Sequence, residues 1–169
     1  MKIMLLGDVG VDFTPYVDAL EKRGYKKWDL EDSLRKLSRT FFDVEAESYR
    51  EREVVKRLRR EFESIDRYCL CKELEFQQAI SNHMELYKHH VLLGVERLDE
   101  WYYFYATGYI PFFVVQNDDL RHRNLAERYG RDKATLILAN EAVDRLPGWH
   151  TESVDDLLIG IDMAYQDFD

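Results

Sequence analysis

Residues 2–24 read KIMLLGDVGVDFTPYVDALEKRG, an apolar run followed by a glycine-containing turn and a helical pattern. The apolar residues from Ile3 to Leu6 predict a buried strand, and a helix is expected over residues 16–23, closed by Gly24. A helix that begins directly after such a turn directs unpaired N–H groups and a partial positive charge toward it. This order of elements is typical of phosphate-binding folds.

The turn matches the phosphate-binding pattern G-x-x-x-x-G-K-[ST] only in part. Gly7 and Thr14 fit, whereas Asp12 stands at the second glycine and Phe13 at the lysine. At about 4 Å and an effective dielectric of about 20, one charge pair is worth about 4 kcal/mol, so replacing the attractive lysine charge with a carboxylate disfavours ATP binding. The alternative interpretation is that Thr14 only caps a helix with Pro15 at its first position.

The composition predicts one folded domain over residues 1–169. Apolar residues make up 46% of the chain and aromatic residues 14%, which excludes a disordered protein. The net charge of −9 makes binding to nucleic-acid phosphates unfavourable. No apolar run approaches membrane-spanning length and no leader peptide is recognisable, so we expect a cytoplasmic protein without membrane contact.

The cysteines and histidines predict no metal site. Cys69 and Cys71 are the only cysteines, and one such pair without a second pair or a nearby histidine does not match a zinc site. The spacing of His83, His89 and His90 matches no compact ligand set either.

The rest of the chain predicts a helix-rich α/β domain. Apolar runs at residues 91–95 and 109–115 predict strands, and residues 25–28 form either a strand or a connector. Between the two runs lies a helix ended by Gly108, and this crossover unit implies a parallel sheet. Helical periodicity or capping residues predict further helices at about residues 30–41, 51–65 and 72–87, after Asn117, and at residues 132–143 and 152–165. The charged residues of the 51–65 segment are expected to form mainly a solvated face.

Three short segments carry a resemblance to a known family: WDLEDSLRK at residues 28–36, VLLGVERLDE at residues 91–100 and HTE at residues 150–152. The first resembles the family's segment at the base site, the second its strand ending in Asp-Val-Arg, and the third its His-x-Ser-Glu-like motif. Together they resemble the bacteriophage deoxynucleoside monophosphate kinases, within the nucleoside monophosphate kinase-like P-loop proteins. The resemblance implies a three-layer P-loop kinase-like fold, with a short parallel sheet flanked by helices.

The resemblance also implies roles for particular residues. Arg97 would approach the monophosphate or the transferring phosphoryl group, while Arg121 and Arg123 would match the lid arginines that clamp phosphates; planar guanidinium groups suit that task. The alternatives are that Arg97 pairs with neighbouring carboxylates and that the other two belong to a surface face. The nucleotide-binding residues would be Gly7, Gly10, Thr14, Asp32 and Arg35.

Three parts of the ATP and Mg²⁺ machinery are missing from the pattern. Asp12 and Phe13 replace the glycine and lysine of the turn, and Gly94 stands where the strand should end in aspartate, with Glu96 two residues on. We therefore expect a degenerate, non-catalytic kinase-like protein without cofactors, which binds a protein partner or itself and is encoded by a phage as a regulator or inhibitor. The alternatives are an active (deoxy)nucleoside monophosphate kinase that uses ATP and Mg²⁺, and an acidic nucleic-acid mimic. Binding of a nucleoside monophosphate stays open.

The aromatic run WYYFY at residues 101–105 has too many rings to face the core at once. Aromatic residues left outside are typical of interface centres. The predicted interface residues are Trp101, Tyr102, Tyr103 and Tyr105.

Overall fold

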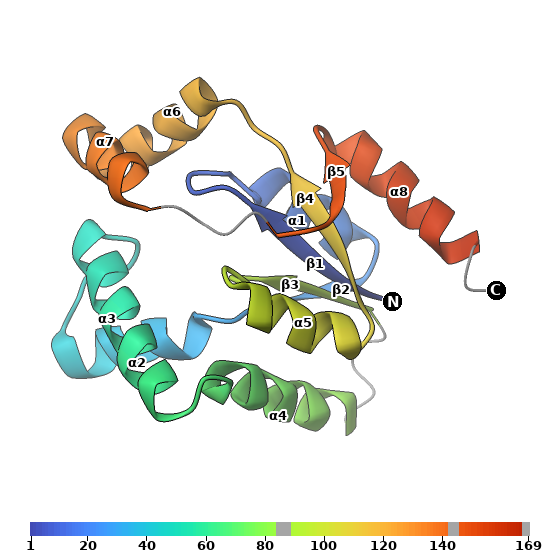
Figure 1. Cartoon of the computed structure of the whole chain (residues 1–169), viewed down its shortest axis with the longest axis horizontal. Helices are drawn as coiled ribbons and strands as arrows, with labels where there is room; N and C mark the ends of the chain where they lie inside the picture. The colour runs from blue at the N-terminus through green and yellow to red at the C-terminus, as the bar shows by residue number, and fades with distance from the viewer. Residues whose placement is uncertain (84–88, 142–145, 167–169) are drawn as a thin grey trace.

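Figure 1 shows the computed structural model of the chain, which describes residues 1–83, 89–141 and 146–166. Its centre is a five-stranded sheet with the strand order β2-β3-β1-β4-β5, and all its strand pairs are parallel. The strands are β1 (Lys2–Gly7), β2 (Tyr25–Asp29), β3 (His89–Leu93), β4 (Tyr109–Val114) and β5 (Trp149–Thr151). The predicted parallel sheet is confirmed.

Helices connect the strands and cover both faces of the sheet (Figure 1). In chain order they are α1 (Thr14–Lys22), α2 (Asp32–Phe42), α3 (Tyr49–Ile65), α4 (Cys69–His83), α5 (Leu98–Ala106), α6 (Asp118–Tyr129), α7 (Arg131–Asn140) and α8 (Val154–Gln166). The expected helix-rich α/β class is therefore confirmed. No helix in the described part of the chain is long and apolar enough to cross a lipid bilayer.

Alternation along the strands separates two hydrophobic clusters, as expected when successive side chains point to opposite faces. Met4 and Leu6 point to the face covered by α2, α3, α4 and α5, while Ile3 and Leu5 point to the face covered by α1 and α8. A third, smaller cluster holds the α6–α7 hairpin together through Leu125, Ala134 and Ile137. The result is a three-layer arrangement, with α6 and α7 beyond the carboxyl ends of the strands (Figure 1).

The turn after β1 and the segments after β3, β4 and β5 lie at the same end of the sheet, because parallel strands share their carboxyl ends. Ligands of open parallel sheets bind at this end. The candidate phosphate-binding residues of the sequence lie at the end of β1, on the segments after β1 and β3, or on the helices that follow β1, β2 and β4.

Several boundaries differ from the sequence-based prediction. The apolar strand predicted at residues 91–95 is β3, which ends at Leu93 because Gly94 has φ +81 and lies against Asp29 and Leu30. β5 was not predicted, since three residues are too few for a period to be visible. The predicted ends of α4 and α7 fall partly in residues 84–88 and 142–145, outside the described residues.

Candidate functional site

The turn after β1 is filled by its own side chains. A Cβ atom built on Gly7 would lie 3.1 Å from Cζ of Phe13 and 3.1 Å from Cγ2 of Val11. Both side chains also pack on the hydrophobic cluster beneath α1. The missing side chain of Gly7 therefore makes room for a phenyl ring and an isopropyl group.

A carboxylate lies at the N-terminus of α1. The backbone N–H of Thr14 donates to Oδ1 of Asp12 at 3.0 Å, and Phe13, at the N-cap position, makes no side-chain cap. The interpretation that Thr14 caps this helix is wrong, because Thr14 is its first residue and acts as a donor to Asp12. Pro15, predicted at the first position of the helix, is its second residue.

Gly10 is the point at which α6 meets the turn. Its φ is +90, and a Cβ atom there would lie 2.9 Å from the carbonyl oxygen of Arg121 and 3.1 Å from Cδ1 of Leu125. Both the backbone conformation and the close approach of α6 therefore require glycine. This contact accounts for Gly10 without a phosphate.

Arg121 is bound to the turn. Its Nη1 donates to the carbonyl oxygen of Val9 at 3.1 Å and lies 3.9 Å from Oδ2 of Asp8, while its Nη2 donates to Asp118 at 2.5 Å. Arg123, two residues on, is exposed. The two predicted lid arginines therefore point to different surroundings.

Amide side chains complete this connection between α6 and the turn. Asn124 donates through Nδ2 to the carbonyl oxygen of Gly10 at 3.0 Å and to Oε1 of Gln116 at 3.1 Å. The same Oε1 atom accepts the backbone N–H of Asp12 at 3.3 Å. Asn117 accepts the N–H of Leu120 at 2.8 Å, which confirms the predicted cap of α6.

Arg97 makes the neighbouring ion pairs that were its alternative role. Its Nε donates to Oδ1 of Asp99 at 3.0 Å, and its Nη1 lies 2.5 Å from Oε2 of Glu63. Two carboxylates thus hold a side chain that is 28% exposed. Arg97 does not line the cleft of about 1120 Å³ between the start of α1, the α2–α3 segment and α6.

Arg59 is the cation at the centre of a group of four carboxylates, and the sequence-based prediction missed it. Its guanidinium lies 2.5 Å from Glu100, 2.9 Å from Glu63, 3.1 Å from Glu31 and 3.5 Å from Glu96. Burial lowers the pKa of Arg59, but the carboxylates, Glu100 foremost, outweigh this effect and leave the pKa above its usual value.

The expected solvated face of α3 needs correction at two positions, since Arg59 and Glu51 are buried. The available signal for Arg59 was its place one turn after the buried Val55, on the face of α3 that packs inward. The surrounding carboxylate Glu100 is only 1% exposed, and burial raises its pKa against the opposing effect of Arg59. It also accepts the backbone N–H of Glu96 at 3.0 Å.

Asp32 and Arg35 lie together at the start of α2. Nη1 of Arg35 is 2.9 Å from Oδ1 of Asp32 and 3.0 Å from Oδ2 of Asp29, and Nη2 is 3.3 Å from Oε2 of Glu31. Burial lowers the pKa of Arg35, but these carboxylates, Asp29 foremost, raise it above the ordinary value. Arg35 is thus surrounded by negative charge.

A cleft of about 1120 Å³ lies between the start of α1, the α2–α3 segment and α6. Of the predicted nucleotide-binding residues, Gly10, Thr14, Asp32 and Arg35 line it. Carboxylates outnumber cations along its walls: the acids include Asp12, Asp18, Glu21, Glu31, Glu96 and Glu127, and the cations include Arg39, Arg52, Lys56 and Arg128. The overall charge of the walls is therefore negative.

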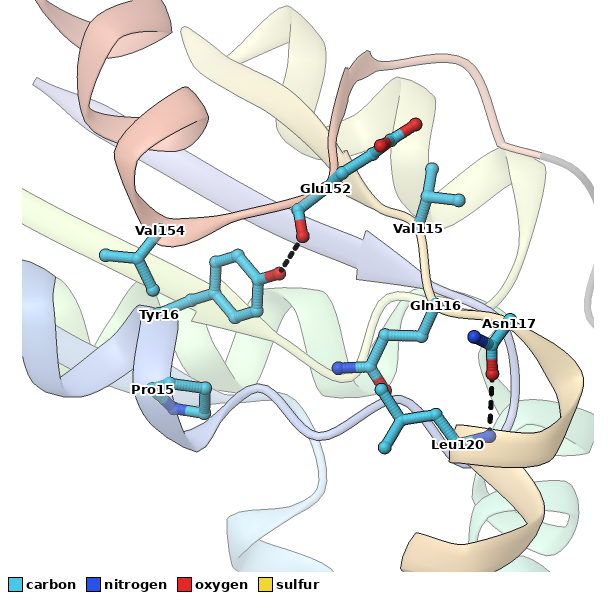
Figure 2. Close-up of a pocket in the computed structure, with 8 residues that line it drawn as sticks. All are labelled: Pro15, Tyr16, Val115, Gln116, Asn117, Leu120, Glu152 and Val154. Atoms are coloured by element: carbon cyan, nitrogen blue, oxygen red, sulfur yellow. Dashed lines mark hydrogen bonds between the residues drawn. The ribbon is translucent and has the colours of Figure 1, made fainter.

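A second cavity, of about 550 Å³, lies at the carboxyl ends of β4 and β5 (Figure 2). Mostly apolar and amide side chains line it, with one carboxylate residue: Pro15, Tyr16, Val115, Gln116, Asn117, Leu120, Glu152 and Val154. The Tyr16 hydroxyl donates to the carbonyl oxygen of Glu152 at 3.2 Å, and the Gln116 amide extends toward Pro15 and Tyr16. This cavity and the cleft thus border the same first turn of α1.

The four predicted interface residues separate into two pairs. Trp101 is buried and donates to the carbonyl oxygen of Pro147 at 2.7 Å, and Tyr103 donates to Glu75 at 2.6 Å. Tyr102 and Tyr105 are 59% and 54% exposed. The outward aromatic surface of α5 therefore consists of Tyr102 and Tyr105, and we call these two residues the α5 aromatic face.

Metal ligands do not gather anywhere in residues 1–83, 89–141 or 146–166, where no three His, Cys, Asp or Glu side chains are grouped so that they could hold an ion. Cys69 and Cys71 are both free thiols, and burial raises the pKa of Cys71 to about 12. A thiol with so high a pKa stays protonated and is a poor metal ligand.

No protein-family model matches the chain, and the curated proteins include no match to it. Solved structures do match in fold. The chain is similar to TT1252 from Thermus thermophilus (18% identity, 100% of this chain and 98% of the other, TM-score 0.51). It is also similar to a gluconokinase from Sinorhizobium meliloti 1021 (9% identity, 99% and 94%, TM-score 0.50) and to an uncharacterized protein from Eubacterium ventriosum ATCC 27560 (11% identity, 100% and 99%, TM-score 0.50). With its parallel sheet between helical layers, the chain therefore has a P-loop kinase-like fold.

Proposed function

We propose that this protein is a non-catalytic member of the kinase-like fold that acts by binding a protein partner. The observation that carries the proposal is the 3.0 Å hydrogen bond from the Thr14 N–H to the Asp12 carboxylate. An N–H group at the start of α1 would face a phosphate in an ATP-binding turn, and here it is bound to an acid of the same chain.

The residues of the turn do not fit a triphosphate with its Mg²⁺ ion. Phe13 and Val11 fill the space beside Gly7, and Arg121 donates to the carbonyl of Val9. A polyphosphate would have to displace Asp12 and would meet Asp8 as a second negative charge. The cost of both steps favours a turn that binds no nucleotide tail.

The α5 aromatic face is the surface that we assign to the partner. Tyr102 and Tyr105 present their rings outward, and Tyr105 stacks on the buried Trp101 with 4.7 Å between ring centroids. Rings held rigidly in this way lose little conformational entropy on binding, which suits the centre of an interface. A second copy of the chain is the simplest partner to test, and the phage origin implied by the sequence resemblance suits a cytoplasmic regulator or inhibitor.

The test combines an activity assay with a measurement of assembly. A coupled kinase assay across the ribonucleoside and deoxyribonucleoside monophosphates should show no turnover above background with Mg²⁺ and ATP. The Tyr102→Ala variant should lose the complex with its partner, as measured by light scattering or pull-down. The exposed control variant Arg123→Ala should keep that complex. Turnover that the Arg97→Ala variant abolishes would overturn the proposal.

A second candidate is an active or nucleotide-binding kinase with an atypical turn. The observation in its favour is that a 550 Å³ cavity and a 1120 Å³ cleft lie on either side of the first turn of α1. Two ligands bound there would meet near Thr14. Calorimetric titration with each nucleoside monophosphate and with ATP and Mg²⁺ separates an active kinase from a nucleotide-binding protein. Binding of the monophosphate alone indicates a sensor, and binding of both the monophosphate and ATP indicates a kinase.

A further inference from the structure

The α2–α3 segment and the α6–α7 hairpin face one another across the large cleft (Figure 1). The cleft is lined on one side by residues of α3 such as Glu51, Arg52 and Val55, and on the other by residues of α6 such as Asn124 and Arg128. Contacts between α3 and the hairpin therefore decide how open the cleft is on this side.

One of these contacts is aromatic and lies at the start of α3. The Tyr49 ring is in edge contact with the Tyr129 ring, with 6.1 Å between centroids and 74° between planes. On the same ring lies the ammonium group of Lys133, 4.5 Å from the centroid. Tyr49 also packs on the small cluster of Leu125 and Ile137, so a residue of α3 belongs to the core of the hairpin.

The other contact is ionic and lies one to two turns further along α3. Arg52 and Lys56 both pair with the Glu141 carboxylate, directly after α7. These side chains are 18% to 24% exposed, so water screens the pairs only in part. The aromatic and ionic contacts together fasten α3 to both helices of the hairpin.

The contact between α3 and the hairpin also carries an energetic penalty. Nε of Arg52 is buried and has no hydrogen-bond partner among the described residues, although the same side chain binds Glu141. A buried donor without a partner loses its bond to water and opposes the state in which it is buried. The contacts of Tyr49 and Glu141 must outweigh this loss to keep α3 on the hairpin.

We propose that Tyr49 and Glu141 form an intramolecular latch, which holds α3 against the α6–α7 hairpin and closes one side of the 1120 Å³ cleft without any ligand. Opening the latch moves the hairpin away from α3 and admits a ligand to the cleft. The latch is independent of the proposed function, because it concerns access to the cleft whatever binds there.

The test measures the distance between α3 and α7 in the protein without ligand. Spin labels are attached at the exposed positions Arg57 and Asp132 through an unnatural amino acid, so that the native cysteines remain. Without further substitutions, the labelled protein should give one narrow distance distribution. The double variant Tyr49→Ala with Glu141→Gln should add a population of molecules at longer distance. This population should be at least several-fold larger than in the protein with an unchanged latch.

Two controls distinguish the latch from general loosening. Tyr49→Phe keeps the ring, and Arg50→Ala changes an exposed neighbour; both should reproduce the narrow distribution. If the double variant does not fold by circular dichroism, Glu141→Gln alone in high salt replaces it, and the longer population should again grow. An unchanged distribution in a folded latch variant would overturn the proposal, as would an equally large long-distance population with the latch intact.

Discussion

Asp12 and Thr14 are joined by a 3.0 Å hydrogen bond in which the Asp12 carboxylate accepts the first N–H of α1. The bond places a negative charge of the protein itself at the positive end of the helix. A helix start satisfied in this way needs no anion from solution. The same bond makes the turn contribute to the stability of the fold.

Asp12→Ala should lower the free energy of unfolding by about 1 kcal/mol, the usual cost of removing a side-chain acceptor at a helix start. Asp18→Ala provides the control, because Asp18 is an exposed residue within α1. Urea denaturation measures both variants. Equal effects of the two substitutions would show that Asp12 does not act through the Thr14 N–H.

Gly10→Ala should destabilise the protein more than Gly24→Ala. Both glycines have positive φ, so alanine strains the backbone at each by about 1 to 2 kcal/mol. A Cβ atom at Gly24 meets no atom within 4 Å, whereas at Gly10 it lies 2.9 Å from the Arg121 carbonyl oxygen. The difference in free energy of unfolding therefore measures how closely α6 packs on the turn, and a difference near zero would contradict that contact.

Arg59→Met should cost about 3 to 5 kcal/mol of stability, since it leaves Glu100 buried without its cation. The neighbouring exposed Arg60→Met should change the free energy of unfolding by less than about 0.5 kcal/mol. Chemical denaturation at neutral pH compares the two. A loss for Arg59→Met as small as that for Arg60→Met would mean that the carboxylates around Arg59 are solvated.

His90 should make stability depend on pH. Trp28 Nε1 donates to Nδ1 of His90 at 2.8 Å, which requires a neutral imidazole, and burial, followed by the charge of Lys2, lowers the His90 pKa. In the unfolded chain histidine titrates near its ordinary pKa of about 6.5. The stabilisation by neutral His90 is therefore complete above about pH 6.5, the ordinary histidine pKa. It is lost as the pH falls below that value and through the lower pKa of His90 in the folded protein.

The variant His90→Asn isolates this effect, because asparagine keeps an acceptor for Trp28 but does not titrate. Its melting temperature should change less between pH 7 and pH 5 than that of the unsubstituted protein. His122→Asn, at a partly exposed site beside Thr135, is the control and should keep the original pH dependence. The same pH dependence in the His90 variant would contradict the role of the buried imidazole.

Tyr103→Ala should lower the stability of the protein more than Tyr102→Ala. Tyr103 stacks on Tyr68 with 5.4 Å between centroids and donates to Glu75, so its loss should cost about 2 kcal/mol. Tyr102 is 59% exposed, and its loss should change stability by less than about 0.5 kcal/mol. A thermal melt measures both, and a large loss for Tyr102→Ala would remove that residue from the proposed interface.

The sequence predicted the elements whose pattern is local. The apolar runs gave β1, β3 and β4, and the strand, turn and helix at residues 2–24 gave the start of the kinase-like fold. β5 escaped prediction because its three residues gain their strand geometry from pairing with β4. A period of two cannot be recognised in so short a segment.

The candidate site was less predictable, because its main contacts join residues distant in the chain. Arg59 binds Glu31 and Glu100, which are 28 and 41 residues away, so its ion pairs could not be inferred from the charges of α3 alone. The same holds for Arg121, which binds the Val9 carbonyl 112 residues away. The pairing of Arg97 with Asp99 was predictable, since the two are neighbours.

The closure of the turn is tested most directly by nuclear magnetic resonance of the backbone amides from Gly7 to Thr14 during titration with ATP and Mg²⁺. These signals should keep their positions at millimolar nucleotide, because Asp12 holds the Thr14 N–H and Phe13 fills the space beside Gly7. Saturable shifts of the Gly10 and Thr14 signals at micromolar nucleotide would contradict the closure of the turn.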